Sequence, residues 1–206
     1  MYRVLTAFIA IAMFGLVVGL TSDVPDRTDV SEDQLALQDQ RTFIGTTRCK
    51  TCHRKPASGE QFRIWEESAH SKAYVTLASA EAKEIGAKKG IENPQTADAC
   101  LKCHATGAGV DAKFLGPKYD IADGVGCESC HGAGQDYYKK ATMVLIYKGE
   151  LDPASVGLVV PTEKTCVGCH NAESPTFKSF NFEESWKKIA HPTPEGGSGA
   201  SGDDEG

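Results

Sequence analysis

The sequence predicts a mainly α-helical domain with extensive loops, and two observations support this fold class. The longest periodic segment covers residues 60–89, where apolar residues recur at helical spacing and no proline intervenes. We therefore expect a helix or a pair of helices there. The second observation is that strand signals are weak along the chain. The apolar positions of the periodic segment are Phe62, Trp65, Ala69, Ala73 and Leu77.

Two further helices are expected later in the chain. One runs from Gln135 to Lys148 and is closed by Gly149. The other begins at Asn181, with a glutamate at the capping-box position, and ends before Pro192. Loops marked by glycine and proline separate the helices, so regular structure is expected over about half of the fold. These loops contain Gly107-Ala-Gly109, Gly116-Pro117 and Asp123-Gly124.

The two ends of the chain differ in composition from its middle. Met1 to Leu20 carries one positive charge followed by an almost unbroken apolar run, which predicts an export signal over residues 1–22. We expect cleavage; if retained, residues 4–20 would be a membrane anchor, and in either case a periplasmic or exported protein follows. Residues 23–41 are predicted to be an acidic flexible linker, residues 42–192 one domain, and residues 193–206 a disordered tail.

Charge and hydrophobic content narrow the class of protein further. The chain has 206 residues, with 22 Lys and Arg against 28 Asp and Glu, and this acidic balance argues against nucleic acid as a partner. Aromatic residues are only 8% of the chain, and the hydrophobic 40% includes all eight cysteines. Apolar side chains alone would give a thin core, so we expect a bound group to fill part of the interior.

One motif, Cys-x-x-Cys-His, occurs four times and contains all eight cysteines. This motif is the attachment signature of c-type haem, in which two thiols form thioethers with the porphyrin and the adjoining histidine binds iron. Two intervening residues on a helical turn place both sulfurs at one porphyrin edge. The four copies are Cys49-Lys-Thr-Cys52-His53, Cys100-Leu-Lys-Cys103-His104, Cys127-Glu-Ser-Cys130-His131 and Cys166-Val-Gly-Cys169-His170.

Zinc binding and redox disulfides are the alternative roles of Cys-x-x-Cys pairs. Because the chain has only six histidines, the probability that a histidine follows each of the four pairs by chance is about one in a million. The gaps of 47, 23 and 35 residues between successive pairs also exceed the usual spacing of a zinc ribbon. The sequence therefore predicts four covalently bound haem c groups, in a compact tetrahaem domain whose core is largely haem.

The number of histidines limits the axial ligands. Four of the six follow the cysteine pairs, so only His70 and His191 remain as distal ligands, and at most two haems can have two histidines. The other two need methionine, lysine or an open face. Met143 is the only methionine after the signal, and Lys139 and Lys140 precede it. A buried apolar methionine and solvent-exposed lysines are the alternative roles of these three residues.

Several segments resemble the tetrahaem cytochrome c-554 family, a group of multihaem c-type cytochromes. Besides the haem motifs, they are Trp65-Glu-Glu-Ser-Ala-His70, Gly126-Cys-Glu-Ser-Cys-His-Gly132, and Ser174-Pro175 leading to Trp186 and His191-Pro192. The resemblance implies that His191 completes the haem on His53, that His70 completes the haem on His131, and that the haem on His104 is five-coordinate. The family's distal histidine for the fourth haem is missing between Gly132 and Lys148, so Lys139, Lys140, Met143 or an open iron would replace it.

These features predict an electron carrier, because no catalytic acid, base or nucleophile stands out beyond the haem ligands. We expect transient docking to redox proteins; the resemblance implies a donor like hydroxylamine oxidoreductase, and the negative charge favours a basic patch on the partner. A membrane would be involved only if the N-terminal segment is retained. One alternative is an enzyme that reduces a small nitrogen oxide at an open haem. The other is a subunit of a haem filament.

Overall fold

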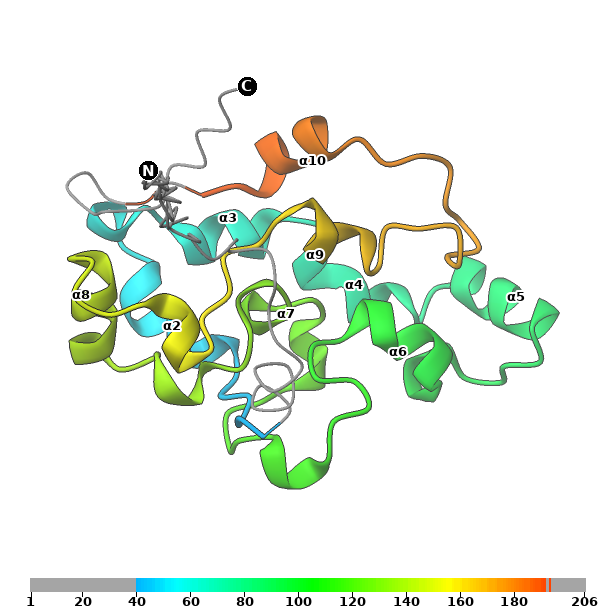
Figure 1. Ribbon diagram of the computed structural model, residues 1–206. Coiled ribbons are helices and arrows are strands. Elements are labelled where there is room, and N and C mark those ends of the chain that lie inside the picture. The colour runs from blue at the N-terminus through cyan, green and yellow to red at the C-terminus, as the bar shows by residue number, and fades with distance from the viewer. Residues whose placement is uncertain (1–39, 192, 194–206) are drawn as a thin grey trace, which may run out of the picture. The chain divides into compact units, whose positions relative to one another are not determined.

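The computed structural model describes residues 40–191 and 193 (Figure 1). These residues belong to the second of two compact units, which begins at Glu32. The predicted signal over residues 1–22 lies outside the described residues, as do the linker up to residue 39, residue 192 and the tail from residue 194. Expectations about export, anchoring and the tail therefore stay predictions.

Short helices joined by loops make up the described residues, which confirms the predicted fold class. Strand-like pairing in this part is limited to one isolated parallel bridge between Phe43 and Leu115. The α-helices are α2 (Thr46–His53), α3 (Gln61–Glu67), α4 (Ala73–Thr76), α5 (Ala80–Lys88), α6 (Asp98–His104), α7 (Cys127–His131), α8 (Lys140–Tyr147), α9 (Glu163–Val167) and α10 (Phe182–Ile189). Single 3₁₀ turns are η1 (Pro56–Ser58), η2 (His70–Lys72), η3 (Pro94–Thr96), η4 (Ala112–Phe114), η5 (Ile121–Asp123), η6 (Gly134–Asp136) and η7 (Pro153–Val156).

The prediction of one helix or a pair of helices over residues 60–89 is wrong about continuity. The segment is helical but is divided into α3, η2, α4 and α5. Ser68 ends α3 with extended backbone, and its hydroxyl donates to the carbonyl of Trp65 at 2.6 Å. Ser79 separates α4 from α5 and accepts a hydrogen bond from the N–H of Ala82. Serine hydroxyls compete in this way with the helical hydrogen bonds of the backbone, and a count of apolar spacing does not detect them.

The two later helices agree better with the sequence. Helix α10 follows Asn181, whose side chain accepts from the N–H of Glu184 at 2.9 Å, so this predicted helix is confirmed. Helix α8 ends before Gly149 as predicted but begins at Lys140, not at Gln135. The preceding residues form η6, and the buried Tyr137 hydroxyl donates to the carbonyl of Gly132 at 2.6 Å.

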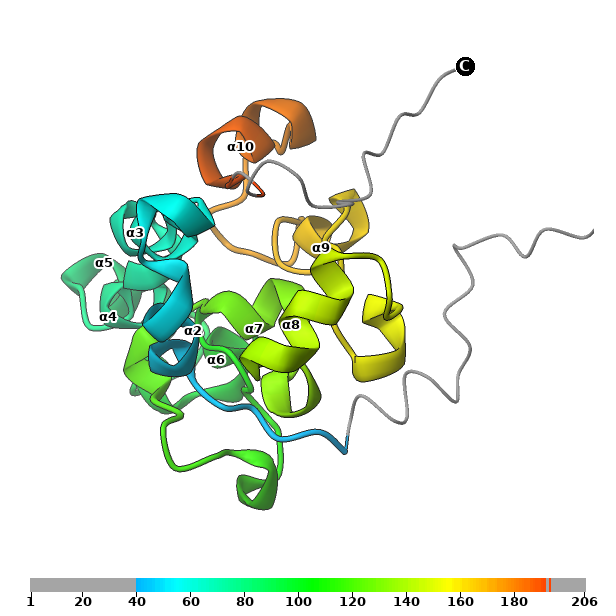
Figure 2. The same ribbon diagram turned by 90° about the vertical axis from the view of Figure 1, so that its left-hand side faces the viewer.

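The protein core among the described residues is thin, as predicted. Its buried hydrophobic residues are Phe62, Leu77, Leu101, Ala105, Ala133 and Tyr137. Leu77, Leu101 and Ala105 form one cluster between α4 and α6. Helix α2 lies against α3 and against α7, so the first and third Cys-x-x-Cys-His motifs are close together (Figures 1 and 2).

Candidate functional site

Each of the four motifs lies at the C-terminal end of a short helix or on the turn after it. The first three end α2, α6 and α7 at His53, His104 and His131. The fourth starts in α9 and continues past its end as a turn, in which the N–H of His170 donates to the carbonyl of Cys166 at 2.9 Å. All four therefore hold both cysteines and the histidine on one turn of chain, as covalent haem attachment requires.

Hydrogen bonds fix the ring orientation of three motif histidines. The Nδ1 atom of His104 lies 2.8 Å from the carbonyl oxygen of Ala73, and Nδ1 of His131 lies 3.0 Å from that of Val159. A carbonyl can only accept, so Nδ1 carries the proton and Nε2 keeps a free lone pair. Nδ1 of His53 lies 3.2 Å from Oε1 of Gln61, whose amide nitrogen donates to the carbonyl of Ser58. These rings are therefore oriented for metal binding through Nε2.

The fourth motif histidine is positioned by stacking. The rings of His170 and Phe180 are nearly parallel, with centroids 4.9 Å apart. His170 lies just beyond α9, and Phe180 precedes α10, so the loop between these helices folds back onto the motif. The Lys102–Glu173 ion pair of 2.6 Å joins the same loop to α6.

Two motif histidines face a histidine outside the motifs. The ring centroids of His70 and His170 are 6.0 Å apart, and those of His131 and His191 are 5.8 Å apart. Two imidazoles that bind one metal ion from opposite sides have centroids about 6 Å apart, because each metal–nitrogen bond is about 2 Å long. Both pairs therefore fit axial ligation of an iron, and the free thiols beside them fit thioether attachment.

These pairs differ from those implied by the family resemblance. His70 faces His170 of the fourth motif rather than His131, and His191 faces His131 rather than His53. The backbone fixes His70 in this place, since its carbonyl accepts from the N–H of Val125 at 3.0 Å. The fourth motif therefore has a facing histidine, although residues 132–148 contain none.

Ionisation of the facing histidines is compatible with metal binding. Burial, followed by the electrostatic effect of His170, lowers the pKa of His70. Burial, followed by His131 and His53, lowers the pKa of His191 to about 4. Both imidazoles are thus neutral at pH 7, which is the form that ligates iron.

The lysines and the methionine proposed as substitute ligands lie on or beside α8. Lys139 lines a basin of about 340 Å³ with Ile44 and Arg48, the latter belonging to α2 of the first motif. Lys140 is exposed and Met143 is half-buried. Since His170 faces His70, a haem on His170 would not require any of these three residues, and their ligand role stays a prediction.

Neighbouring thiols give the spatial order of the motifs. Cys49 and Cys127 lie close to each other, and their interaction together with burial raises the pKa of Cys49. Cys130 interacts electrostatically with Cys166. Burial and the neighbouring Cys103 raise the pKa of Cys169 to about 11. The contact of α2 with α7, and the 4.0 Å between Sγ of Cys169 and the carbonyl oxygen of Lys102, agree with these neighbours. The motifs therefore follow one another in space as first, third, fourth and second, which the sequence order alone does not predict.

A buried carboxylate connects the first and third motifs. Glu128 lies inside the third motif and is only 4% exposed. Its carboxylate accepts from the backbone N–H groups of Ile44 at 2.8 Å, Gly45 at 2.9 Å and Gly134 at 2.7 Å. Burial raises the pKa of Glu128, and the three donors act in the opposite direction.

Gly45 is required where this carboxylate meets the start of α2. Its φ is +86°, and a Cβ there would overlap the carbonyl of Lys118. Glu128 and Gln61 are functional residues that sequence reasoning missed. No periodicity or spacing marks either residue, because both act through contacts made by the folded chain.

Two features are absent from the described residues. No helix among them is long and apolar enough to cross a membrane. No group of three or more His, Cys, Asp or Glu side chains in this part could hold a metal ion on its own.

Comparisons with known proteins agree with the site. Residues 48–132, which include the first three motifs, match the family model described as "Cytochrome c554 and c-prime". Cytochrome c-554 of Nitrosomonas europaea is 31% identical over 170 residues, covering 74% of this chain and 66% of the relative. This chain thus spans slightly less than two thirds of that relative's length. No solved structure matches the chain significantly.

The geometry and the sequence similarity lead to the same conclusion. Three histidines oriented through Nδ1, thiols on the same turn and two facing histidine pairs fit covalently bound haem c. The similarity extends over three of the motifs and most of the described residues. The chain belongs to the cytochrome c-554 family of c-type cytochromes.

Proposed function

We propose that this chain is an exported electron carrier that holds four haem c groups in one continuous row. The single observation that supports it best is that the four motifs lie next to one another. Helix α2 of the first motif contacts α7 of the third, Cys130 of the third motif lies near Cys166 of the fourth, and Sγ of Cys169 lies 4.0 Å from the carbonyl oxygen of Lys102 in the second. Groups attached to adjacent cysteines lie close together. A row of close redox centres passes electrons along its length without any further catalytic residue.

Each part of the motifs has a defined role in this function. The eight cysteines would attach the four porphyrins, and His53, His104, His131 and His170 would bind iron through Nε2. Bound haem iron supplies one-electron exchange between its ferric and ferrous states. The carbonyls of Ala73 and Val159 and the amide oxygen of Gln61 hold three of the rings and increase their basicity.

Coulometric reduction tests the carrier function. Four haems in one row should take up four electrons per chain and return all four to ferricyanide. The double variant C103A/H104A should take up only three electrons per chain, because its second motif would no longer attach haem. Uptake of four electrons by this variant, or fewer than four by the unaltered protein, would contradict the proposal.

A second candidate function rests on the two remaining motif histidines. Within the described residues, no ring contact pairs His53 or His104 with another histidine as His131 and His170 are paired, although His53 lies near enough to His191 to lower the pKa of that ring. If water or nothing completes their coordination, these sites could bind a small nitrogen oxide and reduce it.

Nitric oxide binding tests the second candidate. We expect the reduced protein to bind nitric oxide at two haems in four, or at one if Met143, Lys139 or Lys140 ligates the haem on His53. A carrier binds the gas without consuming it, whereas a reductase consumes it when excess reductant is present. A reduced spectrum unchanged by nitric oxide would refute the open sites and the reductase function together.

A further inference from the structure

The helix of the first motif carries an unusual charge for this chain. Residues 42–59 contain Arg48, Lys50, Arg54 and Lys55 and no carboxylate, in a protein whose net charge is −6. Even when α3 is included, residues 42–67 hold five cations against three carboxylates. The first motif is therefore a basic region of an acidic protein.

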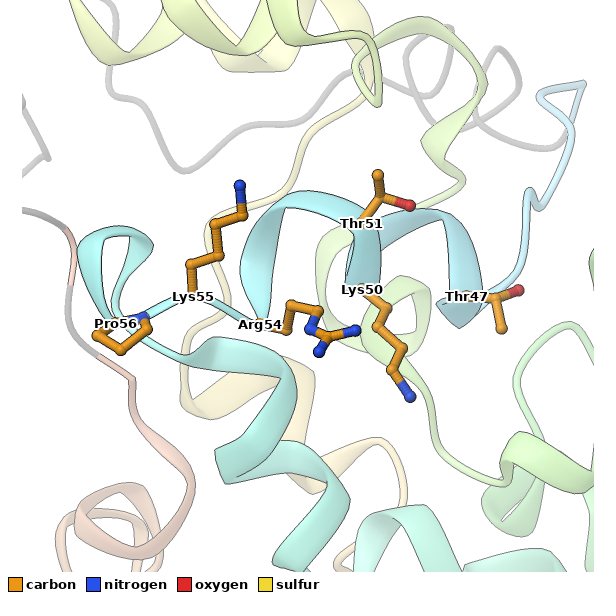
Figure 3. A pocket seen from close by; sticks show the side chains of 6 residues that line it. All are labelled: Thr47, Lys50, Thr51, Arg54, Lys55 and Pro56. Carbon is orange, nitrogen blue, oxygen red and sulfur yellow. The ribbon is translucent and has the colours of Figure 1, made fainter.

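Three of these cations line one open basin. It has a volume of about 620 Å³ and is lined by Thr47, Lys50, Thr51, Arg54, Lys55 and Pro56 (Figure 3). Lys50 and Arg54 extend on the same side of α2, whereas Lys55 extends in the opposite direction in that view. We call Lys50, Arg54 and Lys55, together with this hollow, the basic basin.

Most of the positive charge in the basic basin is not neutralised locally. Lys50 lies 4.0 Å from Glu66 and over the ring of Phe62. Within the described residues, Arg54 and Lys55 have no ion-pair partner within 4.0 Å. On the facing helix α3, Arg63 occupies the carboxylates of Glu60 and Glu67 at 3.1 Å. Arg54 and Lys55 are therefore available to an external partner.

The basic basin is also directly attached to a predicted redox centre. Lys50 and Thr51 stand between Cys49 and Cys52, and Arg54 and Lys55 follow His53. Cys52 itself is exposed. A molecule bound in the basin would lie beside the first haem, where a short distance favours electron transfer.

We propose that the basic basin is the docking surface for a redox protein with an acidic patch around its own redox centre, so that electrons cross at the first motif. The inference rests on the carrier function proposed above. Arg54 and Lys55 are exposed and Lys50 is half-buried, so these side chains suit contact with an extended acidic surface more than the enclosure of a small anion. The net charge of −6 alone would favour a partner with a basic surface. At the first motif, however, the local charge is positive, so the partner that docks there is expected to be acidic.

Stopped-flow reduction by flavodoxin hydroquinone, a strongly acidic one-electron donor, tests the docking surface. The triple variant K50E/R54E/K55E should be reduced at least about tenfold more slowly than the unaltered protein at low ionic strength. The difference should shrink as salt screens the charges over about 10 Å. The double variant R54E/K55E keeps the Lys50–Glu66 pair. It replaces the triple variant in the same rate measurement if the triple variant incorporates less haem.

The matched control reverses two lysines on α5 and the one directly after it, as K83E/K88E/K89E. It has the same net charge as the triple variant, and Figure 1 shows α5 far from α2. This control should change the rate less than about twofold. Equal slowing of both variants, or of neither, would overturn the docking proposal.

Reduction by neutral lumiflavin semiquinone separates this proposal from the carrier function. Its rate should be the same in all variants, because the reagent carries no charge. Ordinary reduction by lumiflavin with no effect of charge reversal would refute the docking surface and leave the carrier function intact. Failure of lumiflavin to reduce the unaltered holoprotein would refute the carrier function.

Discussion

Replacing Glu128 by alanine is expected to lower the free energy of unfolding of the holoprotein by about 3–5 kcal/mol, because it leaves buried N–H groups without acceptors. The carboxylate satisfies the N–H groups of Ile44, Gly45 and Gly134. Water cannot readily replace it at a side chain that is 4% exposed. Guanidinium unfolding followed by circular dichroism measures the loss.

Glutamine at this position is the matched control. Its amide oxygen can keep the bonds that Oε1 makes to Ile44 and Gly134, while the bond of Oε2 to Gly45 is lost. Glu128→Gln should therefore cost less than Glu128→Ala, about 1–3 kcal/mol. If both variants are as stable as the unaltered protein, the carboxylate does not hold the first and third motifs together.

Replacing His70 or His191 by alanine is expected to change the spin state of one haem each. Removing a strong-field imidazole leaves the iron five-coordinate or bound by water, so one low-spin signal in the electron paramagnetic resonance spectrum should become high-spin. The facing pairs predict that His70→Ala affects the haem on His170 and His191→Ala the haem on His131.

Phe180 identifies the affected haem by nuclear magnetic resonance, because its ring stacks on His170 at 4.9 Å. The haem whose ligand signals show contacts with Phe180 should change from low-spin to high-spin in His70→Ala. The same haem should remain low-spin in His191→Ala. Lys83→Ala, at an exposed position on α5, is the control and should leave both signals unchanged. A change at the haem of His131 in His70→Ala would instead favour the pairing implied by the family resemblance.

The chemistry of the site could be predicted from the sequence better than its geometry. All three residues of each attachment motif are adjacent in the chain, so Cys49, Cys52 and His53 can be recognised without a fold. The thin core and helix α10 were also predictable, since composition and the Asn181 cap are local properties.

Features that depend on distant contacts could not be predicted. The facing of His70 and His170 joins residues 100 positions apart, and no spacing rule connects them. The breaks at Ser68 and Ser79 depend on hydroxyl groups that apolar periodicity ignores. Glu128 reads as an ordinary polar residue within its motif until the fold places three N–H groups around it.

The intact mass of the protein, matured in a host with the haem-attachment machinery, tests most directly whether all four motifs carry haem. Denaturation removes any group that is not covalently held, so the remaining mass reports thioether attachment alone. The predicted result is the mass of the processed polypeptide plus about four haem masses. Three or fewer in fully matured protein would contradict the tetrahaem assignment.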